Sequence, residues 1–202
     1  MKTRIVTLIT LLTIVLSVTI TKAATKDGNN NNTAVLVATN NISKIEASGN
    51  VEVYITNGDK DEVKVYDKYY EQNALVQDKD GVLRISSYTA DKLVVLVTVS
   101  DLRAITASDN ASIKSYGTLS AIDLSVTLNN NASAQLKLDA FAADFIVNNH
   151  ATANLSGNVY DYSLAYSQTS TINKTNLTVV NSTVKNTTKE AASLAQEKMA
   201  SL

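Results

Sequence analysis

The sequence predicts an all-β protein whose main part is a β-solenoid, a stack of coils of about 19 to 21 residues. Three observations indicate this fold class. The composition favours Val, Ile, Thr, Tyr and Asn and contains no Pro or Trp, which suits half-buried strands and tight turns. Apolar and polar residues alternate with period two over short segments. A motif of small residues recurs between these segments at intervals close to one coil.

The first 24 residues have the pattern of a secretory signal peptide. Lys2 and Arg4 precede an apolar stretch over residues 5–20, and small residues permit cleavage near Ala23 or Ala24. An uncleaved membrane anchor is the alternative, although the stretch is short beside the ~20 residues that span a bilayer. We therefore expect an exported protein at the cell surface, outside the cell or in the periplasm.

The remaining residues have the length of a single domain. We expect a flexible, Asn-rich lead-in over 25–41, one folded domain over 42–186 and a tail over 187–202. The absence of Cys excludes disulfides and thiolate metal sites, so burial and hydrogen bonds must stabilise the fold. A net charge of −1 without a strong basic block argues against a nucleic acid partner.

The N-terminal half is predicted to contain a β-hairpin. Strands over 51–55 and 63–65 alternate between apolar and polar residues, and Asn57-Gly58-Asp59 supplies a turn between them. A second turn over 78–81 leads into a strand over 82–86. The continuously apolar segment 93–99 is expected to lie buried on both faces.

The C-terminal half carries the repeat. Asn110-Ala111-Ser112-Ile113 recurs as Asn131-Ala132-Ser133-Ala134 and as His150-Ala151-Thr152-Ala153, after 21 and then 19 residues. A looser copy lies at 169–172, and each copy follows a β-rich segment. One copy per coil is the interpretation we adopt. The Asn residues at 129–131 and 148–149 fit coil corners with amides hydrogen-bonded between coils, although soluble loop residues are an equal alternative.

Apolar side chains of successive coils are expected to stack along the interior, because one coil cannot bury its apolar side alone. This set comprises Ile122, Leu124, Leu136, Leu138, Phe141, Phe145 and Leu155. Beyond the coils, Thr187 and Glu190 have the spacing of a capping box, and apolar residues follow at helical spacing. We expect a short C-terminal helix over 187–202 that covers the last coil, with a frayed tail as the alternative.

Several of these segments together resemble a known family. They are Ile42-Ser43-Lys44-Ile45-Glu46-Ala47-Ser48-Gly49-Asn50-Val51-Glu52-Val53, the Asn57-Gly58-Asp59 turn, Val97-Thr98-Val99-Ser100-Asp101-Leu102 and the Ala-Ser repeats. Over about residues 42–184 they resemble the bacterial auto-transporter adhesin head family, called the GIN domain. The family usually has Pro-Glu-Leu where this chain has Ser100-Asp101-Leu102, and Ser-Gly-Ala-Ser where its coils carry Asp-Asn-Ala-Ser and Asn-Asn-Ala-Ser. The resemblance implies a β-solenoid-like fold in an exported protein of a Bacteroidetes-type bacterium, and it brings no catalytic residues.

The sequence offers little that resembles a catalytic or metal site, and we assign no catalytic residue, metal or cofactor. His150, the only His, is read as a coil-corner residue in place of Asn110 and Asn131. The acids at 59, 61 and 62 are read as a solvated turn rather than a calcium loop. A polysaccharide-active enzyme is a remote alternative, because no repeated offset was found that would align four acids on one face: Asp123, Asp139, Asp144 and Asp161.

The expected function is therefore an exported adhesin-like or envelope structural protein that binds through an extended solenoid surface. Its surface ligand is left open between glycan and protein, and a homo-oligomer is left open as well. The alternative is a carbohydrate-binding module. Tyr160, Tyr162 and Tyr166 are separated by even steps, so one straight strand would place all three on one face suited to sugar rings. The competing interpretation is that these tyrosines cover the solenoid's flank.

Overall fold

All elements of the protein's described part are β-strands, which confirms the all-β class. The computed structural model describes residues 34–37, 41–66 and 74–187. The strands of the N-terminal half are β1 (Ala34–Val37), β2 (Lys44–Gly49), β3 (Val51–Asn57), β4 (Glu62–Tyr66), β5 (Ala74–Lys79), β6 (Val82–Ser87) and β7 (Leu93–Val99). Those of the C-terminal half are β8 (Ala104–Ser108), β9 (Ser112–Ser115), β10 (Leu119–Leu128), β11 (Ser133–Val147), β12 (Thr152–Tyr166) and β13 (Thr171–Asn186).

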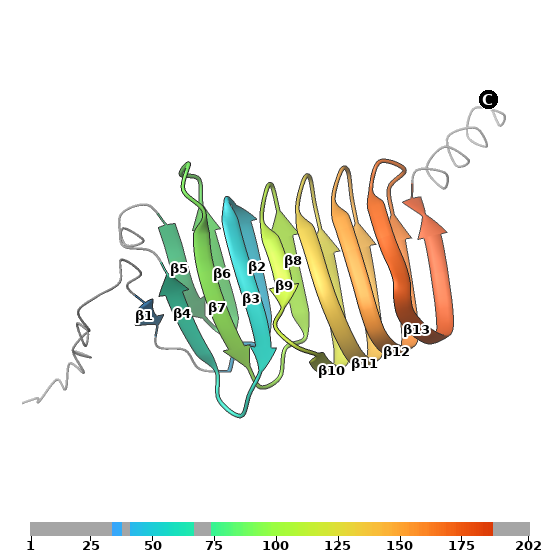
Figure 1. The fold of residues 1–202 in the computed structure, drawn as a ribbon, viewed down its shortest axis with the longest axis horizontal. Helices are drawn as coiled ribbons and strands as arrows, with labels where there is room; N and C mark the ends of the chain where they lie inside the picture. The colour runs from blue at the N-terminus through green and yellow to red at the C-terminus, as the bar shows by residue number, and fades with distance from the viewer. Residues whose placement is uncertain (1–33, 38–40, 67–73, 188–202) are drawn as a thin grey trace, which may run out of the picture.

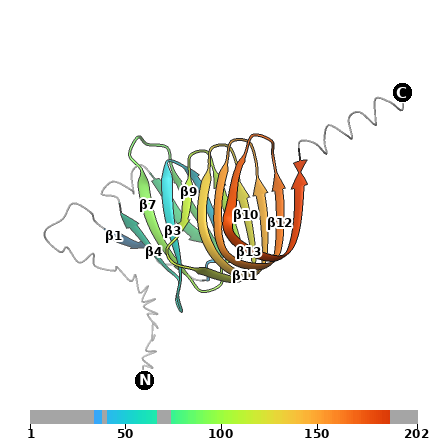
Figure 2. The ribbon, with the colours of Figure 1, turned by 45° about the vertical axis from the view of Figure 1, so that its right-hand side comes forward.

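The thirteen strands form one sheet that curls strongly on itself. They lie side by side along the long axis in Figure 1, and Figure 2 shows the sheet bent into a U. The strands β11, β12 and β13 pass through the bottom of the U and so belong to both of its limbs. The start of β11 pairs with β9 and its end with β10. The first limb therefore contains β1, β4, β7, β3 and β9, and the second contains β5, β6, β2, β8 and β10.

The long strands stack in parallel with the offset that the repeat predicts. Ser112 pairs with Ser133, and Ser133 with Thr152, which in turn pairs with Thr171. The alanines that precede the first three of these residues are all fully buried. Backbone N–H groups of Ser133, Thr152 and Thr171 donate to these alanines' carbonyls at 2.9 to 3.0 Å. The predicted register of Ala111, Ala132 and Ala151 is thus confirmed.

Amide side chains connect the turns that precede successive parallel strands, as expected for the Asn residues at 129–131 and 148–149. The Nδ2 group of Asn148 donates to Asn129 Oδ1 at 2.9 Å, and that of Asn149 donates to Asn130 Oδ1 at 3.1 Å. Asn130 and Asn149 have φ of 59° and 57°, a left-handed conformation that Asn tolerates better than most residues. These Asn residues therefore hold the corners in shape and link them, which decides against the alternative of ordinary loop residues.

The core lies between the two limbs and runs the length of the stack. Five of the seven expected interior residues are buried there: Leu124, Leu136, Leu138, Phe145 and Leu155. Each side chain of this kind contributes ~1.5–3 kcal/mol when fully buried. The expectation is wrong for the other two, Ile122 and Phe141, which are exposed because the strands bend at these positions.

The predicted N-terminal hairpin is wrong, because β3 and β4 do not pair with each other. β7 lies between them, parallel to β3 and antiparallel to β4. The turn after Asn57 therefore spans a third strand, which arrives about 30 residues later in the sequence. A real hairpin joins β5 and β6 through the predicted turn at 78–81, where Asp80 and Gly81 have φ of 55° and 76°.

Two further expectations in this half need correction. Segment 93–99 buries only one face fully: Leu93, Val95, Val97 and Val99 are inaccessible, while the alternate residues are half-buried. The backbone over Ala34–Val37, placed in the lead-in, forms a strand that pairs with β4. The short run Ala-Val-Leu-Val suits a strand by its β-branched residues.

The signal peptide expected over 1–24 and the helix expected over 187–202 lie outside the described residues, apart from Thr187. Within the described ranges, no helix has the length and apolar character required to cross a membrane.

Candidate binding surface on the bends

The bottom of the U is formed where each long strand reverses which of its residues face the core. In β11 the buried residues are Leu136, Leu138 and Ala140, and then Ala143, Phe145 and Val147. Phe141 and Ala142 are two consecutive residues that both face outward, so the alternation shifts by one. β10 and β12 show the same shift. The bend thus turns side chains outward that a straight strand would bury.

Four apolar side chains form a row along the outside of these bends, which we name the bend ridge. Ala121 pairs with Ala140 and Asp123 with Ala142, so Ile122 lies opposite Phe141. The same reasoning places Tyr160 opposite Phe141 and Val180 opposite Tyr160. The bend ridge consists of Ile122, Phe141, Tyr160 and Val180, with exposed fractions of 81%, 58%, 47% and 64%.

The two rings of the ridge stack on each other. The centroids of Phe141 and Tyr160 lie 5.2 Å apart, with only 9° between the ring planes. Ile122 and Val180 continue the row on either side of the pair.

Carboxylates flank the ridge on both sides. Asp123 and Asp161 belong to one row, two coils apart, since both are in register with Ala142. Asp139 and Asp144 lie on β11 to either side of Phe141. The expectation that these four acids would not share a face is therefore wrong, because the bend gathers them. Within the described residues none of the four forms a salt bridge.

Shallow grooves lie beside these acids. One groove, of about 350 Å³, is lined by Asp101, Arg103, Ile122, Asp123, Ser125 and Asp144. Arg103 donates from Nε and Nη2 to Asp101 Oδ2 at 3.0 and 2.7 Å, so its charge is matched by that carboxylate. The other two carboxylates leave the groove negative. A second groove contains Asp144 and Asp161 beside Asn181, whose Nδ2 donates to Asp161 at 2.7 Å.

The three tyrosines singled out from the sequence do not share a face. Tyr160 is exposed on the ridge, Tyr162 is only 2% exposed in the core, and Tyr166 is partly buried against the core. The bend between Tyr160 and Tyr162 reverses the alternation on which the prediction relied. Burial raises the pKa of Tyr162 to about 12, and its hydroxyl has no hydrogen-bond partner among the described residues.

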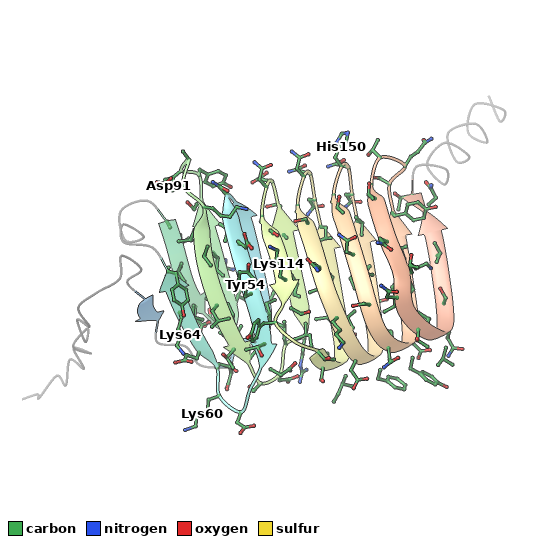
Figure 3. The ribbon with its side chains drawn as sticks, viewed as in Figure 1. Tyr54, Lys60, Lys64, Asp91, Lys114 and His150 are labelled. Carbon is green, nitrogen blue, oxygen red and sulfur yellow. The ribbon has the colours of Figure 1, made fainter. Side chains whose placement is uncertain are left out.

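A separate charged cluster lies on the outer face of the first limb, and it links β3 and β9 with the loop residue that precedes β7. Glu52 accepts hydrogen bonds from Tyr54 Oη at 2.6 Å and from Lys114 Nζ at 2.5 Å, and Lys92 Nζ lies 3.3 Å away. Figure 3 shows Tyr54 and Lys114 side by side at the middle of the sheet. The hydrogen bond from Lys114, followed by that from Tyr54, lowers the pKa of Glu52 to about 2. These partners satisfy the carboxylate, so the cluster connects strands rather than offering a free site.

His150 and the acidic turn at 59–62 lie apart from the bends. His150 projects from a corner on the upper rim in Figure 3, at the position that Asn110 and Asn131 occupy in other coils. Asp61 accepts hydrogen bonds from the backbone of Ile42 and from Ser100 N and Oγ, both at 2.8 Å. Within the described residues, no group of three His, Cys, Asp or Glu side chains could hold a metal ion.

The bend ridge cannot be predicted from period-two alternation alone, although the sequence contains a signal for it. Apolar residues occupy even positions over 136–140 and odd positions over 143–147. The same change of phase occurs in the next coil, between Val159 and Tyr162. A switch of phase within a continuous strand, repeated at the coil interval, marks a bend and the two outward residues that form it.

Comparisons with known proteins agree with this architecture. The chain is similar to the crystal structure of a "putative adhesin" from Parabacteroides merdae at 17% identity, with 79% of each chain covered and a TM-score of 0.56. It is likewise similar to a "putative adhesin" from Parabacteroides distasonis at 21% identity, with 79% of each chain covered and a TM-score of 0.57. At these identities the likeness shows the fold alone. No curated protein matches the chain.

The family comparison covers most of the chain and agrees with the resemblance noted from the sequence. The model described as "Putative auto-transporter adhesin, head GIN domain" matches residues 41–201. The match begins one residue before the core residue Ile42 and includes every strand from β2 to β13. This chain therefore belongs to the auto-transporter adhesin head family, the GIN domain family.

Proposed function

We propose that the protein is an exported adhesin-like binding protein and that the bend ridge is its binding surface. The observation that carries the proposal is the exposed apolar row at the bends. Soluble proteins rarely leave several large apolar side chains contiguous on the surface unless they contact a partner. An apolar centre with a polar rim is also the usual anatomy of an interface.

The family supports this role and location. Adhesins act outside the cytoplasm, which is consistent with the signal peptide that we propose over 1–24. The parallel stack from β8 to β13 supports our description of this region as a short β-solenoid, whose coils give the ridge its regular spacing. Neither the family description nor the exposed carboxylates favour catalysis, because glycosidases hold their general acid in a shielded, apolar environment.

A glycan-binding module is the second candidate, favoured by the exposure of Tyr160 beside acceptor carboxylates. Sugar rings bind to open aromatic faces and to groups such as these. Of the three tyrosines proposed earlier, this site retains Tyr160 and adds Phe141.

Adhesion of protein-coated beads to arrays of surface proteins and glycans would test the proposal. We expect Phe141→Ser/Tyr160→Ser to abolish retention, because it removes the two rings at the centre of the ridge. Tyr88→Ser is the matched control, since Tyr88 is 74% exposed in the loop between β6 and β7, away from the bends. Retention that survives the ridge variant would contradict the proposal. Signals confined to glycan spots would favour the second candidate.

A further inference from the structure

We propose that the bend ridge binds a basic amphipathic polypeptide, whose apolar side chains cover the ridge while its Lys or Arg side chains pair with the flanking acids. This inference rests on the proposed function and names the class of partner. It draws on ring orientation, charge and spacing.

The orientation of the rings argues against a sugar as the main ligand. Sugars bind aromatic side chains through the ring face, but Phe141 and Tyr160 cover each other's inner faces at a centroid distance of 5.2 Å. Ile122 and Val180 extend the row with aliphatic groups on either side of the pair. A row that combines stacked rings with aliphatic groups matches the apolar side chains of a polypeptide better than the flat face of a pyranose.

The charge beside the ridge selects a basic partner. Four aspartates flank the row, and in the nearest groove the only cation, Arg103, is already paired with Asp101. Lys137 lies beyond Asp139 on the same outward face of β11, at the edge of this surface. Opposite charges across an interface favour the correct partner and accelerate association, whereas like charges repel. An acidic segment would therefore be rejected.

The distance between neighbouring ridge residues is close to the pitch of an α-helix, so each ridge residue could contact one helical turn. Neighbouring coils in a sheet lie ~4.8 Å apart, and a helix advances 5.4 Å per turn. The mismatch over the three intervals of the ridge is only ~2 Å. A helix with an apolar stripe and flanking Lys residues could thus lie along the row and contact all four side chains.

The test uses two designed peptides and the full chain. One peptide of about 18 residues has a Leu stripe flanked by Lys, and its twin has Glu in place of Lys. Fluorescence anisotropy should show binding of the Lys peptide that weakens with added salt, and no binding of the Glu peptide. Phe141→Ser/Tyr160→Ser should weaken binding about tenfold or more, because aromatic residues at an interface centre carry much of the affinity. The urea midpoint of this variant establishes that it folds.

Neutralising two of the aspartates that flank the bend ridge separates this inference from the proposed function. We expect Asp123→Asn/Asp144→Asn to weaken Lys-peptide binding several-fold at low salt. Asp59→Asn/Asp91→Asn, which removes the same charge elsewhere on the surface, should have no effect. The inference would be overturned if both peptides bound equally or neither bound. An unchanged affinity of Asp123→Asn/Asp144→Asn for the Lys peptide would overturn it as well. If bead adhesion depended on Phe141 and Tyr160 but not on Asp123 and Asp144, the proposed function would hold and the inference of a basic partner would fail.

Discussion

Gly157 occupies a position on β12 where a side chain cannot be accommodated. Its φ is +98°, and a Cβ would lie 2.0 Å from the carbonyl oxygen of Leu138 in the neighbouring coil. Gly157→Ala must therefore both adopt an unfavourable backbone conformation and push two coils apart. We expect it to lower the free energy of unfolding by at least ~2 kcal/mol, measured by urea denaturation.

Gly117 provides the matched control for this prediction. Its φ of +86° is equally unusual, but a Cβ there would meet no atom within 4 Å. Gly117→Ala should cost only the backbone strain, ~1 kcal/mol. Equal losses for the two variants would show that contact between coils does not govern the requirement for Gly157.

Glu52 should make stability depend on pH in the acid range. Its folded pKa of about 2 lies below its ordinary value of 4.5, so its ionised form is stabilised by folding. That contribution is complete above about pH 4.5 and is lost as the pH falls toward 2. The stability advantage of wild type over Glu52→Gln should therefore shrink between about pH 5 and pH 2.5 in urea titrations.

The NMR titration of Glu52 in Lys114→Met tests the cause of that shift. Lys114 is the largest influence on the carboxyl, so its removal should raise the pKa of Glu52 toward the ordinary value. An unchanged pKa would show that the Lys114 hydrogen bond does not hold the carboxylate in its ionised form.

β13 is a long strand whose outer edge no other described strand covers. Its pairing with β12 is interrupted by a bulge, in which Lys174 and Thr175 stand opposite Leu155. Thr175 N and Oγ1 both donate to Asn173 Oδ1, at 3.2 and 3.0 Å, and so support the bulge. Lys174 Nζ lies 5.2 Å from the ring centroid of the buried Tyr162. Bulges and inward charges of this kind keep an edge strand from pairing with another chain.

Lys174→Val should therefore promote self-association. Val would extend the apolar row of Leu136 and Leu155 and remove the charge that blocks a further strand. Sedimentation velocity should reveal dimers that increase with concentration. Lys185→Val is the control, because Lys185 faces outward on the same strand, opposite Ala165. Identical sedimentation of both variants and wild type would contradict this role for Lys174.

The turns at Asn130 and Asn149 could be predicted from the local chemistry of their residues. The bends at Phe141 and Tyr160 could not be predicted in this way. Asn130 and Asn149 have chemistry specific to left-handed corners, and their motif recurs once per coil. Phe141 and Tyr160 carry no such local signature. Period-two alternation predicts a straight strand, so it assigned Phe141 to the core and grouped Tyr160 with Tyr162. Only the change of phase, compared between coils, reveals the bend.

The stack as a whole should tolerate removal of a complete coil but not of part of one. Deleting residues 133–151 joins Ala132 to Thr152, which stands in register with the deleted Ser133. We expect this variant to unfold cooperatively, with an m-value lower in proportion to the smaller buried surface. Deleting 133–141 leaves a coil too short to pass around the core. The 133–141 deletion variant should therefore lack a cooperative unfolding transition. If it were as stable as the 133–151 deletion variant, the interpretation as stacked repeats would be contradicted.

The arrangement of the N-terminal half was the least predictable at this scale. β3 and β4 are neighbours in sequence with a good turn between them, yet β7 pairs with both. Local turn chemistry cannot indicate a strand that inserts from about 30 residues away. The C-terminal half was more predictable, because the long strands β11, β12 and β13 each pair with the next one in the chain.

Pairing between consecutive coils also determines how the molecule responds to tension. A force on the C-terminal end of β13 acts on hydrogen bonds to β12 alone, so strands peel away one after another instead of breaking together. Each released coil of 19 residues adds ~65 Å of extended chain. A single-molecule pulling trace should therefore show a sawtooth with that period. Such stepwise yielding would let the protein stay attached under load by lengthening, a mechanical property suited to a molecule that holds two surfaces together.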